Sequence, residues 1–103
     1  MKFSLNHIRH LYSFQSHYID VGGHRYHYLD EGRGEPIVLL HGNPSWSFMY
    51  RKVILTLRET YRIIVPDHIG CGLSDKPDKK TYKYTLEKRT RDLECLLEQL
   101  GIT

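Results

Sequence analysis

The feature that most constrains this chain is a run of four apolar residues at positions 37–40, Ile-Val-Leu-Leu, which ends at His41. A strand that is apolar at every position is typical of a parallel sheet covered on both faces. A second run, Tyr61 to Val65, is apolar except for Arg62 and stops at Pro66. Because helices must cover both faces of such a sheet, the two runs predict an α/β fold.

A β-hairpin is predicted ahead of these runs. Its strands are expected at His17 to Val21 and at His24 to Leu29, joined by the turn Gly22-Gly23, which tolerates positive φ. On the second strand, alternation places two sets of side chains on opposite faces, namely Arg25, His27 and Leu29 against His24, Tyr26 and Tyr28.

Two helices are predicted, separated by a strand and a turn-rich loop at residues 67–83. The first is expected from about Ser47 to Arg58, capped by Ser45 or Ser47, and the second follows a cap at Thr85. Glycine at position 101 supplies the C-terminal stop of the second helix. Each helix carries an apolar stripe expected to face the sheet: Tyr50, Val53, Ile54 and Leu57 on the first, and Leu86, Leu93, Leu96, Leu97 and Leu100 on the second.

The expected order is therefore a β-hairpin followed by β-α-β-α, within one domain spanning residues 1–103. Residues 1–14 are expected to be a loose N-terminal segment. Two strands of this apolar character need more cover than two helices supply, so the sheet is expected to be incomplete, as in a chain that stops partway through a larger fold.

Composition argues against several classes of protein. The chain is 40% hydrophobic and 26% charged, which is ordinary for a globular domain. No apolar run approaches the roughly 20 residues that span a bilayer, and no signal-peptide core is present, so a cytoplasmic location is expected. The net charge of +3 is spread along the chain, which argues against nucleic acid as a partner.

Neither a metal nor a cofactor is expected. The cysteines, Cys71 and Cys95, are expected to be reduced thiols. His7 and His10 have no acidic or cysteine ligand beside them, and His24 and His27 fall on opposite faces of one strand.

Two long loop sequences resemble those of α/β-hydrolases. The run at residues 41–51, HGNPSWSFMYR, resembles the loop after their third strand, and the run at 66–77, PDHIGCGLSDKP, resembles the loop after their fourth. The segment from Tyr84 to Glu94 resembles the helix before their nucleophile strand. The resemblance covers about residues 11–103 and implies the N-terminal portion of an α/β-hydrolase fold, without its cap domain and C-terminal half.

Within the superfamily the chain resembles haloalkane dehalogenase-like hydrolases, because Asn43 stands where epoxide hydrolases usually carry an aromatic residue. The same loops also resemble the β-lactone decarboxylases of bacterial olefin biosynthesis, and the sequence leaves both open. Epoxide hydrolases and esterases are further alternatives. The resemblance implies a parent enzyme with an aspartate nucleophile, or a serine, acting on a small hydrophobic molecule.

The nucleophile itself is missing from the sequence. No serine or aspartate has glycines both two before and two after it, as a nucleophile elbow requires. On this fold the catalytic acid and histidine follow the nucleophile, so none of the seven histidines is expected to be catalytic. The 103-residue chain alone is therefore expected to be inactive. A non-catalytic nucleotide-binding module is less well supported, because no Gly-x-Gly-x-x-Gly or Walker sequence follows an apolar strand.

The residues present fit the charge-stabilising side of such a site. The resemblance implies that Asn43 supplies a main-chain N–H and a side-chain amide to a departing group or an oxyanion. Trp46 is a candidate for contact with substrate, with packing as the alternative. The remaining candidates are expected to shape the loops: His41, Gly42, Pro44, Asp67, Gly70 and Gly72.

A further expectation concerns the edge of the sheet. In α/β-hydrolases the strand corresponding to residues 37–40 pairs with the strand that would follow Thr103. Its free edge is therefore expected to be open, apolar and prone to self-association.

Overall fold

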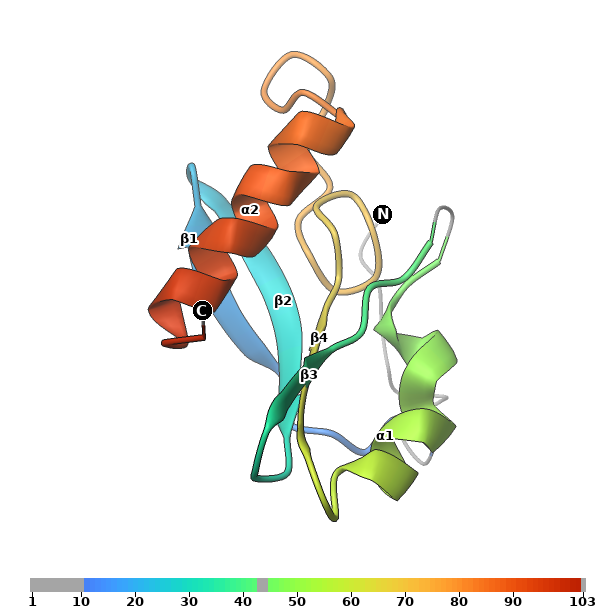
Figure 1. The fold of residues 1–103 in the computed structure, drawn as a ribbon. Helices are drawn as coiled ribbons and strands as arrows, with labels where there is room; N and C mark the ends of the chain where they lie inside the picture. The colour runs from blue at the N-terminus through green and yellow to red at the C-terminus, as the bar shows by residue number, and fades with distance from the viewer. Residues whose placement is uncertain (1–10, 43–44, 103) are drawn as a thin grey trace.

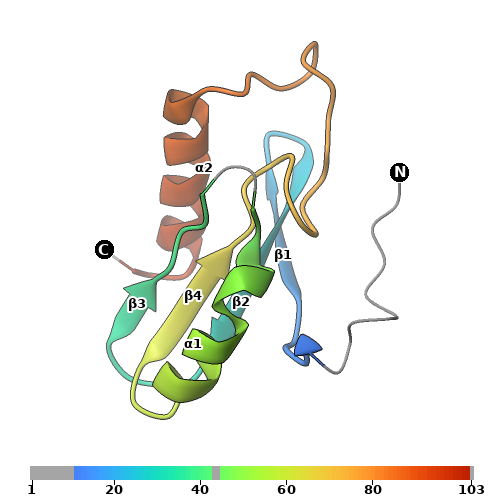
Figure 2. The same ribbon diagram turned by 90° about the vertical axis from the view of Figure 1, so that its right-hand side faces the viewer.

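The computed structural model describes residues 11–42 and 45–102. Its elements are β1 (His17–Val21), β2 (His24–Glu31), β3 (Pro36–Val38), the 3₁₀ helix η2 (Ser47–Tyr50), α1 (Arg51–Leu57), β4 (Arg62–Pro66) and α2 (Leu86–Gln99). The strands form one sheet in the order β1-β2-β4-β3. Only the β3–β4 pair is parallel. Figures 1 and 2 show α1 and α2 on opposite faces of this sheet, which confirms the predicted α/β architecture.

The hairpin forms as predicted. Gly22 and Gly23 have φ of 59° and 88°, and the Asp20 Oδ1 atom accepts a hydrogen bond of 2.8 Å from the Gly23 N–H. β2 runs two residues further than predicted, because Asp30 and Glu31 pair with β4. Arg62 donates two hydrogen bonds to the Asp30 carboxylate, at 2.9 and 2.7 Å, which fixes this end of the antiparallel pair.

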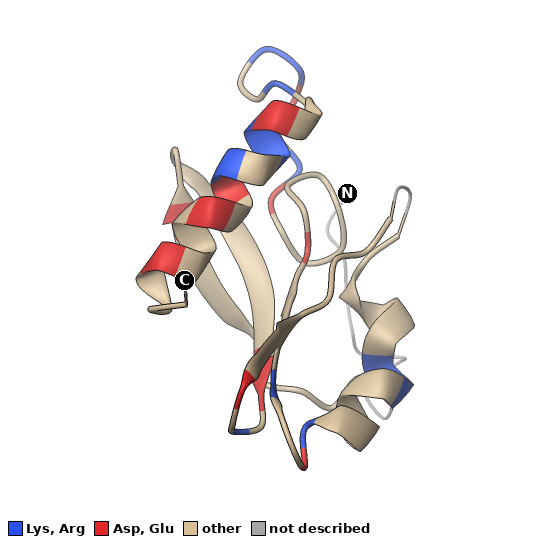
Figure 3. Ribbon diagram, in the orientation of Figure 1, with Lys and Arg blue, Asp and Glu red and all other residues tan. Residues whose placement is uncertain are grey.

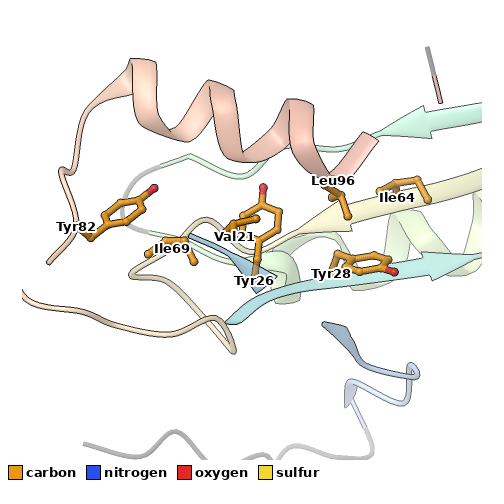
Figure 4. Packing of buried hydrophobic residues seen from close by; sticks show 7 residues of the cluster. All are labelled: Val21, Tyr26, Tyr28, Ile64, Ile69, Tyr82 and Leu96. Atoms are coloured by element: carbon orange, nitrogen blue, oxygen red, sulfur yellow. The ribbon is translucent and has the colours of Figure 1, made fainter. Parts of the chain in front are cut away.

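The core lies in two layers, one on each face of the sheet. Ile64 of β4 packs toward α2 with Tyr26, Tyr28 and Leu96 (Figure 4). The neighbouring β4 residues Ile63 and Val65 point to the other face, where a second cluster contains Ile54 of α1. All of these β4 side chains are fully buried, as expected of a strand covered on both faces.

The run at residues 37–40 is less buried than predicted. β3 ends at Val38, residues 37–39 are only half-buried, and Leu40 is 43% exposed. The physical reason is that β3 lies at the end of the strand order, with β4 as its only neighbour in the described part of the chain. The second apolar run, by contrast, occupies the interior of the sheet.

The first helix differs from its prediction at its start. It opens as a 3₁₀ turn, and neither predicted serine caps it, because Ser45 Oγ donates to Met49 Sδ and Ser47 Oγ shares a buried hydrogen bond with Tyr12. Within α1, Val53 was predicted to face the sheet but lies 41% exposed, while its neighbour Ile54 is fully buried, so the buried face of this helix is narrower than predicted.

The second helix has both predicted ends. Thr85 Oγ1 accepts from the Lys88 N–H at 3.1 Å. At the C-terminus Gly101 has φ of 72°, and the N–H groups of Gly101 and Ile102 donate to the carbonyls of Glu98 and Leu97, a Schellman motif. Leu86, predicted to face the sheet, is 83% exposed, because it borders cavities beside residues 40–42 and 70–71 instead of lying over a strand.

Charges of both signs are interleaved along α2 (Figure 3). Two i,i+4 ion pairs contribute, Lys88–Asp92 at 2.6 Å and Arg91–Glu87 at 3.0 Å. Neither helix of the described residues is long and apolar enough to cross a membrane.

Candidate functional site

The two loops that resemble those of α/β-hydrolases leave the sheet side by side. β3 and β4 are parallel neighbours in the register Val38↔Ile64, and the Leu39 N–H continues the pairing by donating to the Ile64 carbonyl at 2.9 Å. The loops that begin at His41 and at Asp67 therefore start at the same edge. This carboxyl-terminal edge is where α/β folds place their ligands.

Asp67 is the central residue that joins these loops. Its side chain is fully buried, and Oδ1 accepts a 2.6 Å hydrogen bond from the N–H of Ser47, at the start of η2. Oδ2 accepts from the Leu73 N–H at 3.2 Å and from His27 Nδ1 at 2.7 Å. One carboxylate thus ties together the helix that follows the first loop, the turn of the second loop, and β2. It also supplies the hydrogen-bond acceptor at the start of the helix that the predicted serine caps do not, and its negative charge is favourable there.

His27 is a partner that sequence reasoning missed. It is fully buried on β2, 40 positions before Asp67, and its Nε2 atom lies 2.9 Å from Ser16 Oγ. With a carboxylate oxygen as its partner, Nδ1 is the donor to Asp67, and Nε2 pairs with the Ser16 hydroxyl. The usable sequence signal was a histidine on the inward face of an otherwise buried strand.

This arrangement has the connectivity of a hydrolytic triad, yet it is structural. The order serine–histidine–aspartate is present, but His27 and Asp67 have no solvent exposure. The Asp67 carboxylate is also committed to the two main-chain N–H groups of Ser47 and Leu73. A triad needs a nucleophile that a substrate can reach, with oxyanion donors beside it. The network therefore holds the loops in place.

His41 fixes the start of the first loop. It is 4% exposed, its Nε2 atom accepts from the His68 N–H at 3.0 Å, and its Nδ1–H donates to the Gly42 carbonyl at 2.7 Å. The His41 and His68 rings lie 4.3 Å apart between centroids. Burial, with smaller contributions from His41 and Arg89, lowers the pKa of His68 to about 4, so its imidazole is neutral at pH 7.

The glycines of the second loop have clear steric roles. Gly70 has φ of 96°, and a Cβ there would lie 2.6 Å from Tyr84 Cε1. Gly72 has φ of 52°, and a Cβ there would lie 2.7 Å from Asp67 Cγ. At Gly42, by contrast, a Cβ would meet no atom of the described residues within 4 Å.

The remaining predicted site residues divide into two groups. Asn43 and Pro44, the centre of the predicted donor loop, lie outside the described residues. Trp46 is half-buried, and its ring centroid lies 5.2 Å from that of Tyr12 and 5.3 Å from that of Phe48. The indole thus packs with the cluster on the α1 face. The structure groups His41, Gly42, Asp67, Gly70 and Gly72 in the two adjacent loops.

In the described part of the chain, no group of three or more His, Cys, Asp or Glu side chains could hold a metal ion. A cavity of about 270 Å³ does open beside the first loop, between the ends of β3 and β4 and the helix α2. Leu40, His41, Gly42 and His68 form one wall, and α2 forms the other.

Sequence comparison identifies relatives over most of the chain. A family model described as the alpha/beta hydrolase fold matches residues 35–103. The chain is 54% identical over 92 residues to a cis-3-alkyl-4-alkyloxetan-2-one decarboxylase of Shewanella oneidensis, covering 89% of this chain and 29% of the relative. It is 42% identical over 92 residues to haloalkane dehalogenase 2 of Mycobacterium tuberculosis, covering 89% of this chain and 32% of the relative.

Structural comparison agrees. The crystal structure of the haloalkane dehalogenase DatA from Agrobacterium tumefaciens matches with a TM-score of 0.76 and 34% identity, covering 85% of this chain and 29% of that one. The epoxide hydrolase CorEH matches with a TM-score of 0.71 and 37% identity, covering 85% and 30%. The chain thus spans less than a third of these structures. It belongs to the α/β-hydrolase fold family and carries the N-terminal portion of that fold.

Proposed function

We propose that residues 41–44 supply the charge-stabilising loop of a nucleophilic displacement site, to which a carboxylate nucleophile comes from outside these 103 residues. In such a reaction the carboxylate attacks a carbon, and the bond to the leaving group breaks with its electron pair. Negative charge then grows on the leaving atom, and the main-chain N–H and side-chain amide of Asn43 donate hydrogen bonds to it. Only donors that bind this developing charge more tightly than the ground state accelerate the step.

The observation that carries this proposal is the anchoring of the residues on either side of positions 43 and 44. Before them, His41 Nε2 accepts from the His68 N–H, and after them, Asp67 Oδ1 accepts from the Ser47 N–H. A donor contributes to catalysis when it is already aimed before the charge develops, and anchored flanking residues suit that role. Both anchors stand at the edge of the sheet where ligands bind in α/β folds.

We favour a β-lactone as the substrate of the whole protein. Decarboxylases of cis-3-alkyl-4-alkyloxetan-2-ones from Shewanella oneidensis and Xanthomonas campestris are 54% and 52% identical to this chain over the matched residues. A haloalkane is the second candidate, because the haloalkane dehalogenases of Mycobacterium tuberculosis and Mycobacterium marinum are 42% and 50% identical to this chain over the matched residues. In both cases the group that accumulates charge, a lactone oxygen or a halogen, would face the same loop.

A chimera tests the proposal. Residues 1–103 are joined to the part of the Shewanella oneidensis decarboxylase that follows its matched segment, and to the corresponding part of the Mycobacterium marinum dehalogenase. We expect carbon dioxide release from a 3,4-dialkyl-oxetan-2-one by the first chimera, halide release by the second, and no activity from the 103-residue chain alone. Two folded chimeras without activity, or turnover by the isolated chain, would refute the assigned role.

A further inference from the structure

A buried tyrosine from the segment before β1 contacts residues that follow the proposed charge-stabilising loop. In this pre-β1 segment, residues 11–16, Tyr12 is only 1% exposed and belongs to the cluster on the α1 face (Figure 1). Its ring centroid lies 5.2 Å from that of Trp46 and 6.1 Å from that of Phe48. Its hydroxyl lies 2.6 Å from Ser47 Oγ, in a buried hydrogen bond. Tyr12 thus contacts three consecutive residues at the start of the first helix.

The pre-β1 segment also reaches the other side of the Asp67 network. Ser16 Oγ lies 2.9 Å from Nε2 of His27, whose Nδ1 donates to Asp67 Oδ2 at 2.7 Å. Ser47, which is fully buried, donates its N–H to the other Asp67 oxygen at 2.6 Å. Two of the three donors to this carboxylate are therefore held in place by hydroxyls from positions 12 and 16.

The Tyr12 hydroxyl is suited to a fixed role in the interior. Burial raises the pKa of the Tyr12 phenol, which the bond to Ser47 only partly offsets, so the hydroxyl keeps its proton at neutral pH. Both partners of the bond are buried, so water does not readily replace the tyrosine hydroxyl if it is removed. Its loss would leave the Ser47 hydroxyl without this partner and allow the residue to shift.

We propose that Tyr12 is a positioning residue of the site. By fixing Ser47, it holds the residues that follow positions 41–44 in the arrangement that turnover needs, although its burial keeps it from touching substrate. The inference rests on the function proposed above, because a loop without a part in the reaction would need no positioning. A displacement of about 1 Å at a reacting centre can cost about 100-fold in rate, so the loss of one buried hydrogen bond beside the loop is measurable as kcat.

Two tyrosine-to-phenylalanine variants of the decarboxylase chimera test the inference. Tyr82 is the matched control, because it is 3% exposed and its hydroxyl donates at 2.6 Å to Asp92, in the cluster on the α2 face. A hydrogen bond to a carboxylate is stronger than one between hydroxyls, so Tyr82→Phe should lower the urea midpoint at least as much as Tyr12→Phe. We expect Tyr12→Phe to lower kcat about 10- to 100-fold with little change in KM, and Tyr82→Phe to leave both unchanged.

A double-mutant cycle shows whether Tyr12 acts through Ser47. Ser47→Ala removes the partner hydroxyl but keeps the main-chain N–H that donates to Asp67. If the two hydroxyls act through their mutual bond, Ser47→Ala should lower kcat as far as Tyr12→Phe does, and the double variant should lose no more than either one. Losses that multiply in the double variant, or equal kcat values for Tyr12→Phe and Tyr82→Phe, would overturn the positioning role.

Amide hydrogen exchange on the 103-residue chain adds a readout without turnover. Relative to the N–H groups of β4, the Ser47 N–H should exchange at least about 5-fold faster in Tyr12→Phe, as loss of one hydrogen bond implies, but not in Tyr82→Phe. Unchanged relative exchange in Tyr12→Phe would also overturn the inference. If Asn43→Ala slows the chimera and Tyr12→Phe does not, only this inference fails; if Asn43→Ala has no effect, the proposed function fails and this inference fails with it.

Discussion

Replacing Asp67 with alanine should destabilise the chain far more than replacing any exposed aspartate. The carboxylate is fully buried and accepts from three donors, the N–H groups of Ser47 and Leu73 and the Nδ1–H of His27. Asp67→Ala leaves all three without their acceptor in the interior. It also opens a small void beside Gly72, whose absent Cβ made room for the carboxylate.

The magnitude follows from these donors. An unsatisfied buried donor costs about 1–3 kcal/mol, and relaxation around the smaller side chain recovers part of that, so the three together cost about 3–6 kcal/mol. A whole domain has a free energy of unfolding of only about 5–15 kcal/mol. Asp67→Ala should therefore remove a large share of the stability. Asp67→Asn should cost less, because its amide oxygen can still accept from Ser47.

Urea unfolding followed by circular dichroism measures the difference. Asp78→Ala is the control, because Asp78 Oδ1 also accepts from two main-chain N–H groups, those of Lys80 and Thr81, but in an exposed turn. Water replaces the lost carboxylate there, so the cost should be at most about 1 kcal/mol. If Asp67→Ala and Asp78→Ala lose the same free energy of unfolding, the reasoning about the buried carboxylate is wrong.

Three further predictions concern backbone strain, pH and association. In urea titrations, Gly72→Ala should lower the free energy of unfolding by more than Gly22→Ala does. Both glycines have positive φ, which costs an alanine roughly 1–2 kcal/mol, but of the two only Gly72 has neighbouring atoms where the new Cβ would lie. Equal losses in the two variants would contradict this reasoning. The pKa of His68 is lowered from 6.5 to about 4, so the stability that its neutral ring preserves is complete above pH 6.5 and is lost as the pH falls toward 4. His68→Gln should flatten that part of the pH–stability curve, and an unchanged curve would refute the role. We also propose that the open edge of β3 drives self-association. Leu40→Lys should then lower the mass measured by light scattering toward that of a monomer, whereas Leu55→Lys, at a similarly exposed leucine of α1, should leave it unchanged. Equal effects of the two variants would show that general surface hydrophobicity, and not this edge, causes the association.

Local signals predicted the elements well where the cause of the structure is itself local. The positive φ of Gly22, the cap at Thr85 and the stop at Gly101 each depend on a few neighbouring residues, and each formed as predicted. The parallel character of the two apolar strands was predicted from their composition, but their pairing with each other, which brings the two loops to one edge, is seen only in the structure.

The failures have non-local causes. The exposure of Leu40 depends on which strands stand beside β3. The His27–Asp67 pair joins residues 40 positions apart, and no local pattern reveals which buried histidine will meet which carboxylate. Likewise, Arg89 lines a cavity only because the fold brings α2 beside residues 40–42.

The most direct test of the central claim is the turnover of the decarboxylase chimera carrying Asn43→Ala, beside a Ser45→Ala control in the same loop. If Asn43 stabilises charge on the departing group, kcat should fall about 100- to 1,000-fold with little change in KM, as for loss of one oxyanion donor. Ser45→Ala should leave kcat close to that of the parent chimera, because among the described residues the Ser45 hydroxyl donates to the Met49 sulfur. An Asn43→Ala chimera that turns over as fast as its parent would contradict the account.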